Sequence, residues 1–279
     1  MKMVKTIGCI IARTISTRLP KKVLKNINDK TLIENIIEKT KRAKNIDKIY
    51  LCTSIDPEDS ILLNIAEKSG IQGYAGSRES VIDRMLDVAE LEKADNLVRI
   101  TGDNIFCDDI FMDRMIELHN EYNADYTRTA SLPLGITAEI FSVSGLKEMY
   151  NRLDPDQTEY LTYYVFFKEN NLKKLVLYPP RKFQKPFYNL TVDTPADLER
   201  TLFIIEHLKM KKKIYLDDIL KLNEKVKIPH LELDRNIQIK FPNNQKKLYG
   251  EYLEELKREY KKCIVLNLTE DFYEKNKVK

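Results

Sequence analysis

The segment TIGCIIARTISTRLPKK, residues 6–22, indicates the fold because it joins a buried strand to a basic loop. Its first seven residues form an apolar run, which is typical of a strand buried on both faces of a parallel sheet. The following residues include Arg13, Arg18 and Lys22, with hydroxyl side chains between them. Ligands bind at the carboxyl ends of such strands, and a triphosphate needs cations and N–H donors. The segment therefore predicts an anion-binding loop; a solvated basic loop is the alternative.

The same alternation of strand and helix patterns continues to about residue 122. Apolar runs predict strands at 48–53, 71–74 and 96–101. Helical spacing and end signals predict helices at 31–44, 56–69, 80–92 and 109–122. This order predicts an α/β fold with a mostly parallel central sheet and helices on both faces.

The pattern is less regular in the second half of the chain. Strands are predicted at 125–129, 137–143, 172–178 and 189–192, and helices at 157–169, 195–208 and 248–260. Residues 263–268 resemble a strand, and 271–279 are expected to fray. We divide the chain into a catalytic domain, 1–228, and a partly helical C-terminal extension, 229–279. The apolar stripe of the extension must pack on that domain or in a dimer contact.

Composition excludes several classes of protein. Apolar residues make up 43% of the 279, so wholesale disorder is not expected. The net charge of +4 is too small for a nucleic-acid-binding signature. No secretory signal or membrane-length apolar run is visible, and the four cysteines lack zinc-site spacing. We expect a cytoplasmic protein with neither nucleic acid nor membrane as a partner.

Two aspartates follow predicted strands at the same edge of the sheet as the basic loop. Asp103 comes after Gly102 at the end of 96–101, and Asp193 comes between 189–192 and a helix opened by Pro195. Either could be a helix N-cap. Because both lie at the edge that carries the loop, the sequence favours a shared Mg²⁺ site.

Some common nucleotide motifs are missing from the sequence. It has no GxxxxGK[ST] loop and no GxGxxG after the first strand, which argues against P-loop ATPases and dinucleotide oxidoreductases. The one DxD sequence is Asp154-Pro155-Asp156, which we interpret as a helix N-cap rather than a glycosyltransferase metal motif.

Four motifs in order resemble a family of bacterial cytidylyltransferases that make CMP-activated acidic sugars. They are IIARTISTRLPKKVL (10–24), GSRESVIDR (76–84), VRITGDNIFCD (98–108) and LTVDTPADL (190–198). That family includes CMP-Kdo and CMP-acylneuraminate synthetases, and the branch most similar in these motifs is the SpsF-like spore-coat polysaccharide group. The resemblance covers about residues 5–208 and implies a Rossmann-like nucleotidyltransferase fold.

The resemblance also implies roles for individual residues. Nucleotide contacts are expected from Ala12, Arg13, Ser16, Arg18, Lys22, Gly76, Arg84, Thr101 and Asp103. Catalytic roles are expected for Lys22, Arg13 and Asp103, Mg²⁺ binding for Asp103 and Asp193, and acceptor contacts for Gly135, Glu139 and Glu159. The family usually has glycine where this chain has Ile15 and Lys21, and histidine where it has Tyr160.

The implied reaction transfers CMP from CTP to a small acidic sugar or sugar-like acceptor and releases pyrophosphate. It requires Mg²⁺ and belongs to surface polysaccharide biosynthesis. A homodimer is expected, because related enzymes are commonly dimeric. The alternatives are a nucleotide-sugar glycosyltransferase, which releases a nucleoside diphosphate, and a non-catalytic nucleotide-binding relative.

Overall fold

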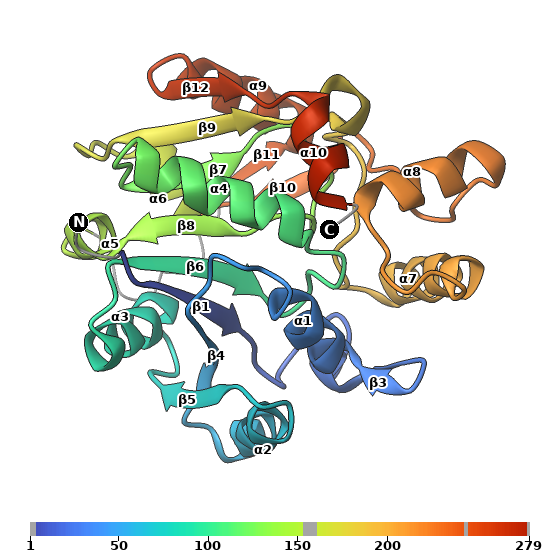
Figure 1. Ribbon diagram of the computed structural model, residues 1–279, viewed down its shortest axis with the longest axis horizontal. Coiled ribbons are helices and arrows are strands. Elements are labelled where there is room, and N and C mark those ends of the chain that lie inside the picture. Colours follow the sequence, from blue (N-terminus) through green and yellow to red (C-terminus); the bar gives the residue numbers. More distant parts are fainter. Residues whose placement is uncertain (1–3, 153–160, 243–244, 278–279) are drawn as a thin grey trace.

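The computed structural model describes residues 4–152, 161–242 and 245–277, and its centre is an eight-stranded sheet (Figure 1). The strand order is β12-β9-β7-β8-β6-β1-β4-β5. Neighbours are parallel except at β8, which is antiparallel to β6 and β7. The bounds are β1 (Thr6–Ile11), β4 (Lys48–Ser54), β5 (Gln72–Gly76), β6 (Asn96–Thr101), β7 (Tyr126–Thr129), β8 (Glu139–Ser142), β9 (Lys174–Tyr178) and β12 (Ile264–Asn267). The predicted α/β class is confirmed.

Helices cover both faces of the sheet, because the side chains of its central strands alternate between two apolar cores. On β1, Ile10 belongs to one core, and Ile7 and Cys9 belong to the other. The first core includes α1 (Leu32–Thr40), α2 (Ser60–Lys68), α4 (Asp109–Glu121), α7 (Pro195–Leu208), α8 (Leu216–Lys225) and α10 (Glu270–Lys277). The second includes α3 (Val81–Glu92), α5 (Val143–Tyr150), α6 (Leu161–Phe167) and α9 (Tyr249–Tyr260).

Local sequence determines where several helices begin. Thr31 and Glu34 form a capping box at α1, and Ser80 caps α3. Thr194 caps α7, which starts with Pro195. Shorter elements join the helices and strands: β2 (Asn26–Ile27) with β3 (Lys30–Thr31), β10 (Gln238–Lys240) with β11 (Lys246–Leu248), and the 3₁₀ turns η1 (Lys22–Leu24), η2 (Pro57–Asp59) and η4 (Arg181–Phe183).

The prediction of a sheet strand at 189–192 is wrong. The segment makes only an isolated bridge, between Asn189 and Leu134, and the N–H of Val192 donates to the carbonyl of Asp103 at 3.0 Å. Leu190 and Val192 are nevertheless fully buried. Their apolar character reflects packing of a loop against the edge of the sheet, which the sequence pattern does not distinguish from a strand.

The expectation that residues 271–279 fray is also wrong for the part that the structure describes. Helix α10 occupies Glu270–Lys277, and Tyr273 is fully buried. Its ring lies 5.1 Å from that of Phe111 and 4.5 Å from that of Phe183, and its hydroxyl donates to Asp108 Oδ2 at 2.5 Å. Helices α5 and α8 were not predicted from the sequence. In the case of α8, the lysine-rich stretch before it obscures its apolar positions.

The C-terminal extension packs on the rest of the chain. Strand β12 pairs in parallel with β9 and forms one edge of the sheet (Figure 1), and α9 contacts α6. Leu256 and Tyr260 of α9 lie in the second core. The apolar stripe is therefore used within the chain, and the homodimer stays a prediction. In the described part of the chain, no helix is both long and apolar enough to cross a membrane.

Candidate active site

A cavity of about 570 Å³, here called the loop cavity, opens at the carboxyl ends of β1 and β6. Its lining includes residues predicted from the sequence: Ala12, Arg13, Ser16, Arg18, Lys22, Arg84, Thr101, Asp103 and Asp193. Gly76 is not in the lining. It supports the cavity from behind, since a Cβ at Gly76 would lie 3.0 Å from Cγ of Arg84.

The two strands that carry the loop cavity end very close together. The N–H of Gly102 donates to the carbonyl of Ile11 at 2.8 Å, and a Cβ at Gly102 would lie 2.9 Å from that of Ala12. Only glycine fits this approach without a shift of the backbone. The approach brings the basic loop after β1 against Asp103 after β6.

Lys22 joins the two aspartates at the centre of the loop cavity. Its Nζ lies 2.6 Å from Asp193 Oδ1 and 3.3 Å from Asp103 Oδ2. Arg18 Nη2 lies 3.2 Å from Asp193 Oδ1, and the hydroxyl of Thr101 donates to Asp103 Oδ1 at 2.5 Å. Segments far apart in the sequence thus converge on one cluster of opposite charges.

Neither aspartate is a helix N-cap. The cap of α4 is Asp108, whose Oδ1 accepts from two backbone N–H groups, and the cap of α7 is Thr194. Asp103 and Asp193 instead direct their carboxylates toward Lys22. The helix-cap alternative is therefore excluded at both positions, and both carboxylates are available to cations.

The charge of Lys22 is secured by its partners. Burial alone lowers the pKa of the Lys22 ammonium, but the nearby carboxylates of Asp103 and Asp193 outweigh burial and raise the pKa above its usual value. Lys22 is therefore a permanent cation at neutral pH, in reach of any phosphate that enters the loop cavity.

The basic loop is anchored by Asp59, a residue that the sequence analysis missed. Asp59 Oδ1 accepts from both the N–H and the hydroxyl of Thr14 at 2.7 Å, and Oδ2 accepts from Ser54 at 2.6 Å. Burial raises the pKa of Asp59, but these hydrogen bonds lower it below its usual value overall. Lys21 completes the loop in the left-handed conformation, with φ of 51°, at a position where the family usually has glycine.

A Mg²⁺ ion at this site would have few protein ligands. Among the described residues, no group of three or more His, Cys, Asp or Glu side chains converges on a point. Asp103 and Asp193 supply two carboxylates that already face a cation. Mg²⁺ is commonly held by one or two carboxylates together with substrate phosphates and water, so the pair fits Mg²⁺ delivered with a nucleotide.

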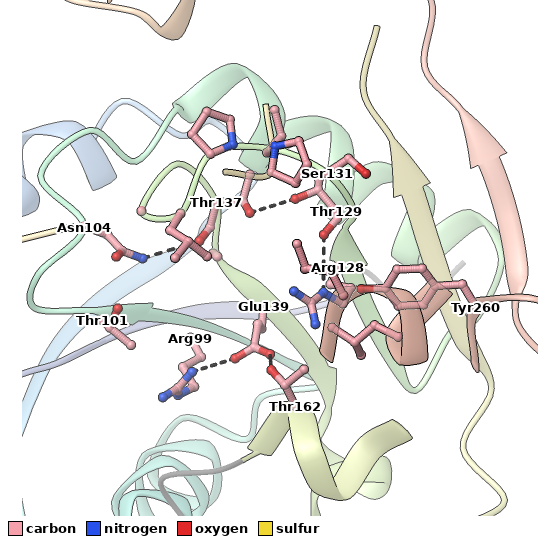
Figure 2. Close-up of a pocket in the computed structure, with 18 of the residues that line it drawn as sticks. Arg99, Thr101, Asn104, Arg128, Thr129, Ser131, Thr137, Glu139, Thr162 and Tyr260 are labelled. Atoms are coloured by element: carbon pink, nitrogen blue, oxygen red, sulfur yellow. Dashed lines mark hydrogen bonds and ion pairs between the residues drawn. The ribbon is translucent and has the colours of Figure 1, made fainter. Parts of the chain in front are cut away.

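A second cavity of about 200 Å³, here called the Glu139 cavity, is shown in Figure 2 and shares part of its lining with the loop cavity. Arg99 and Thr101 line both cavities. Glu139 accepts hydrogen bonds from Arg99 Nη1 at 2.6 Å and from the Thr162 hydroxyl at 2.8 Å. It also accepts from Tyr126 Oη at 2.5 Å. Burial raises the pKa of Glu139, but Arg99 and Arg128 outweigh burial, so the pKa is lowered and the carboxylate is ionised.

Gly135 also lines the Glu139 cavity, as predicted. Its φ is +89°, and a Cβ there would lie 2.8 Å from the backbone of Leu190 and Thr191. This close contact ties the loop of the Glu139 cavity to the segment that leads into Asp193. Glu159, Tyr160 and the Asp154-Pro155-Asp156 sequence lie outside the described residues.

Comparison with known proteins identifies the family. The sequence model of the cytidylyltransferase family matches residues 7–249. The chain belongs to the cytidylyltransferase family. It is 33% identical over 196 residues to the Bacillus subtilis spore coat polysaccharide biosynthesis protein SpsF, covering 68% of this chain and 82% of SpsF. It is 32% identical over 207 residues to an uncharacterized protein of Methanocaldococcus jannaschii, covering 74% and 85%.

The fold of this cytidylyltransferase agrees with that of solved relatives. A cytidylyltransferase structure from Leptospira borgpetersenii superposes with a TM-score of 0.73 at 27% identity, covering 80% of this chain and 95% of the other. The predicted nucleotidyltransferase fold is confirmed, as is membership of an enzyme family that transfers nucleotidyl groups.

Several residues that line the Glu139 cavity of this cytidylyltransferase were missed from the sequence. They are Arg99, Asn104, Arg128, Thr129, Thr137 and Thr162 of the first 228 residues, and Tyr249, Leu253, Leu256, Lys257 and Tyr260 of α9. The α9 residues come at or after the end of the family match. No local motif marks them, because a helix with an apolar face looks the same whether it faces a core or a cavity.

Proposed function

We propose that this cytidylyltransferase transfers CMP from CTP to a small acidic sugar or sugar-like acceptor, with Mg²⁺, and releases pyrophosphate. The contact of Lys22 with both Asp103 and Asp193 is the observation that carries the proposal. In support of the proposal, cations of the kind that bind a triphosphate lie beside two carboxylates of the kind that bind a metal, next to a second cavity of about 200 Å³.

The reaction is an in-line displacement. An acceptor oxygen forms a bond to the α-phosphorus of CTP, the bond from that phosphorus to the bridging oxygen breaks, and pyrophosphate leaves. Lys22, Arg13 and Arg18 bind the triphosphate and neutralise the negative charge that increases on the leaving group. Asp103 and Asp193 would hold Mg²⁺, which polarises phosphoryl oxygens when bound.

The wall that the two cavities share supports the proposed positions of the nucleotide and the acceptor. Arg99 and Thr101 line both cavities, so an acceptor in the Glu139 cavity lies next to a nucleotide in the loop cavity. The ionised Glu139 accepts hydrogen bonds, and it is suited to orient the hydroxyl groups of a sugar. Preorganised positioning of this kind accounts for much of the rate in phosphoryl-group chemistry.

CTP and a polysaccharide pathway are proposed from the family and from SpsF. The family is named for cytidylyl transfer, and SpsF is named for spore coat polysaccharide biosynthesis. The resemblance of the sequence motifs to CMP-Kdo synthetases supports an acidic sugar as the acceptor. A glycosyltransferase would instead release a nucleoside diphosphate.

A pyrophosphate-release screen tests the proposal. CTP, ATP, GTP and UTP are each combined with 3-deoxy sugar acids, nonulosonic acids and sugar phosphates, with and without Mg²⁺. We expect pyrophosphate and a CMP-linked product only with CTP and Mg²⁺, and no turnover by the folded variants Asp103→Ala and Asp193→Ala. Release of a nucleoside diphosphate, or full activity of either variant, contradicts the proposal.

A further inference from the structure

Arg128 lies in the wall of the Glu139 cavity with one of its donors unused (Figure 2). It belongs to β7, and its Nε donates to the carbonyl of Thr129 at 3.3 Å. In the part of the chain that the structure describes, its buried Nη1 has no hydrogen-bond partner. Burying a charged N–H donor without a hydrogen-bond partner costs free energy. A ligand that supplies the missing acceptor recovers that free energy, and water competes little at a buried atom.

The guanidinium group of Arg128 lies against a pair of aromatic side chains that pack on each other. Its Cζ lies 5.8 Å from the ring centre of Phe166 in α6 and 6.0 Å from that of Tyr260 in α9. Contacts with ring faces stabilise the cation without using its N–H donors. The side chain is therefore fixed in place while part of its hydrogen-bonding capacity is left for a ligand.

Glu139 does not satisfy this capacity. Its carboxylate already accepts from Arg99, Tyr126 and Thr162. The lining of the Glu139 cavity also contains Lys257, so among the described residues that line it the cations outnumber Glu139, their one acidic side chain. This balance of charge favours an anionic ligand over a neutral one.

One wall of the Glu139 cavity comes from the C-terminal extension. Tyr249, Leu253, Leu256, Lys257 and Tyr260 of α9 line the cavity, whereas the family match ends at residue 249. The position that holds Arg128 from this side, Tyr260, is thus beyond the part of the chain that the family shares. The Glu139 cavity is thus completed by residues that lie beyond the family match.

We propose that Arg128, held by Tyr260 of the extension, is the receptor for the anionic group of the acceptor, either a carboxylate or a phosphate. The inference rests on the proposed function, because it assigns the Glu139 cavity to the acceptor. A planar guanidinium with free N–H groups binds either anion by charge-assisted hydrogen bonds. Glu139 then accepts hydrogen bonds from the hydroxyl groups of the same molecule.

Matched pairs of small ligands test this role by calorimetry. Gluconate and sorbitol differ by a carboxylate, and glucose 6-phosphate and glucose differ by a phosphate; 3-deoxy-D-manno-octulosonate is added as a sugar acid. We expect one class of anion to bind more tightly than its neutral partner. Arg128→Met should weaken that binding by about 10–100-fold, Arg128→Lys by less, and neither should change sorbitol or glucose binding.

Lys262→Met is the matched control, because it removes a positive charge from an exposed position just after α9 and outside the lining of the Glu139 cavity. We expect less than a threefold change. Equal losses in Lys262→Met and Arg128→Met, unchanged anion affinity in Arg128→Met, or no anion binding by the wild type would each overturn the inference. If Arg128→Met does not fold, a crystal structure of the wild type with the sugar acid decides whether its carboxylate contacts Arg128.

CTP binding, measured on the same samples, separates the two proposals. CTP affinity that is unchanged in Arg128→Met, together with lost anion affinity, supports the inference. Wild-type protein that binds no CTP contradicts the proposed function, whatever the ligand pairs show.

Discussion

The two cavities of this cytidylyltransferase are neighbours, but they are built in different ways. The loop cavity takes most of its cations from one loop after β1, and its carboxylates follow a buried strand and a short apolar segment. The Glu139 cavity takes its lining from β6, β7, β8, α6, several loops and α9. The first therefore has a compact sequence motif and the second has none. A sequence motif therefore indicates the proposed nucleotide site, whereas the proposed acceptor site is recognised only in the folded chain.

The largest expected effect concerns the cation at the centre of the loop cavity. Lys22→Ala should lower kcat by about 10²–10³, as for loss of one well-placed transition-state donor, because Lys22 is the cation that contacts both aspartates. Steady-state pyrophosphate release measures it. The adjacent, exposed Lys21→Ala is the control and should change kcat by less than about threefold. Comparable losses in both variants would show that the loop needs only net charge.

A second prediction separates the extension from the nucleotide site. Tyr273→Phe should destabilise the protein by about 2 kcal/mol near pH 8 and about 1 kcal/mol near pH 4.5. Burial raises the pKa of Asp108 to about 6, and the Tyr273 hydroxyl opposes that rise by stabilising the ionised carboxylate. The hydroxyl therefore contributes more to the free energy of unfolding above pH 6 than below it. Urea unfolding at both pH values measures the difference.

The sign of the wild-type dependence follows from the same pKa. Since the folded pKa of Asp108 is above that of an ordinary aspartate, its contribution to stability is full below about pH 4 and is lost as the pH rises through 6. CTP affinity should be unchanged in Tyr273→Phe. An equal loss of stability at both pH values, or weaker CTP binding, would contradict the assignment.

The third prediction tests how the basic loop is held. Asp59→Ala should raise KM for CTP about tenfold, because loss of one charged acceptor releases the Thr14 N–H and hydroxyl. The kcat of the saturated enzyme should fall by less. Glu58→Ala, in the same 3₁₀ turn but exposed, is the control. Changes of the same size in both variants would remove Asp59 from the loop's support.

The smallest effect is expected from a residue in an unfavourable conformation. Lys21→Gly should stabilise the protein by about 0.5–1 kcal/mol, because Lys21 has φ of 51°. Lys93→Gly is matched to it, since Lys93 has φ of 50° at the end of α3. Thermal unfolding should show a similar gain in both variants. Only Lys21→Gly should also alter CTP affinity; an effect of Lys93→Gly on CTP would make the comparison uninformative about the loop.

The sequence predicted what short-range patterns encode. The loop from Arg13 to Lys22 is contiguous, and Asp103 follows a buried strand, so their meeting at one sheet edge followed from topology alone. Asp193 was also predicted at this edge, and it lies there although the segment before it is not a strand. The segment is held at the edge because the N–H of Val192 donates to the carbonyl of Asp103. The prediction gave the right neighbour for a partly wrong reason.

Long-range contacts account for what the sequence did not predict. Tyr273 is ordered by Asp108, which lies 165 residues earlier, so its own surroundings in the sequence resemble a polar tail. Arg128 looks like an ordinary strand residue until α6 and α9 bring aromatic rings against its guanidinium group. Asp59 resembles a helix-starting aspartate, and its bonds to Thr14 show its role only once the loop is in place.

The parallel pairing of β12 with β9 has a consequence for how the protein is made. About 85 residues separate the two strands, so a ribosome adding residues at its usual pace needs roughly 4–17 s after β9 to deliver the partner strand. The lysine and both aspartates of the loop cavity have been translated before α9 appears. The residues of the loop cavity are thus all translated before the α9 wall of the Glu139 cavity exists, and the edge of β9 stays unpaired during that interval, when another extended chain could pair with it.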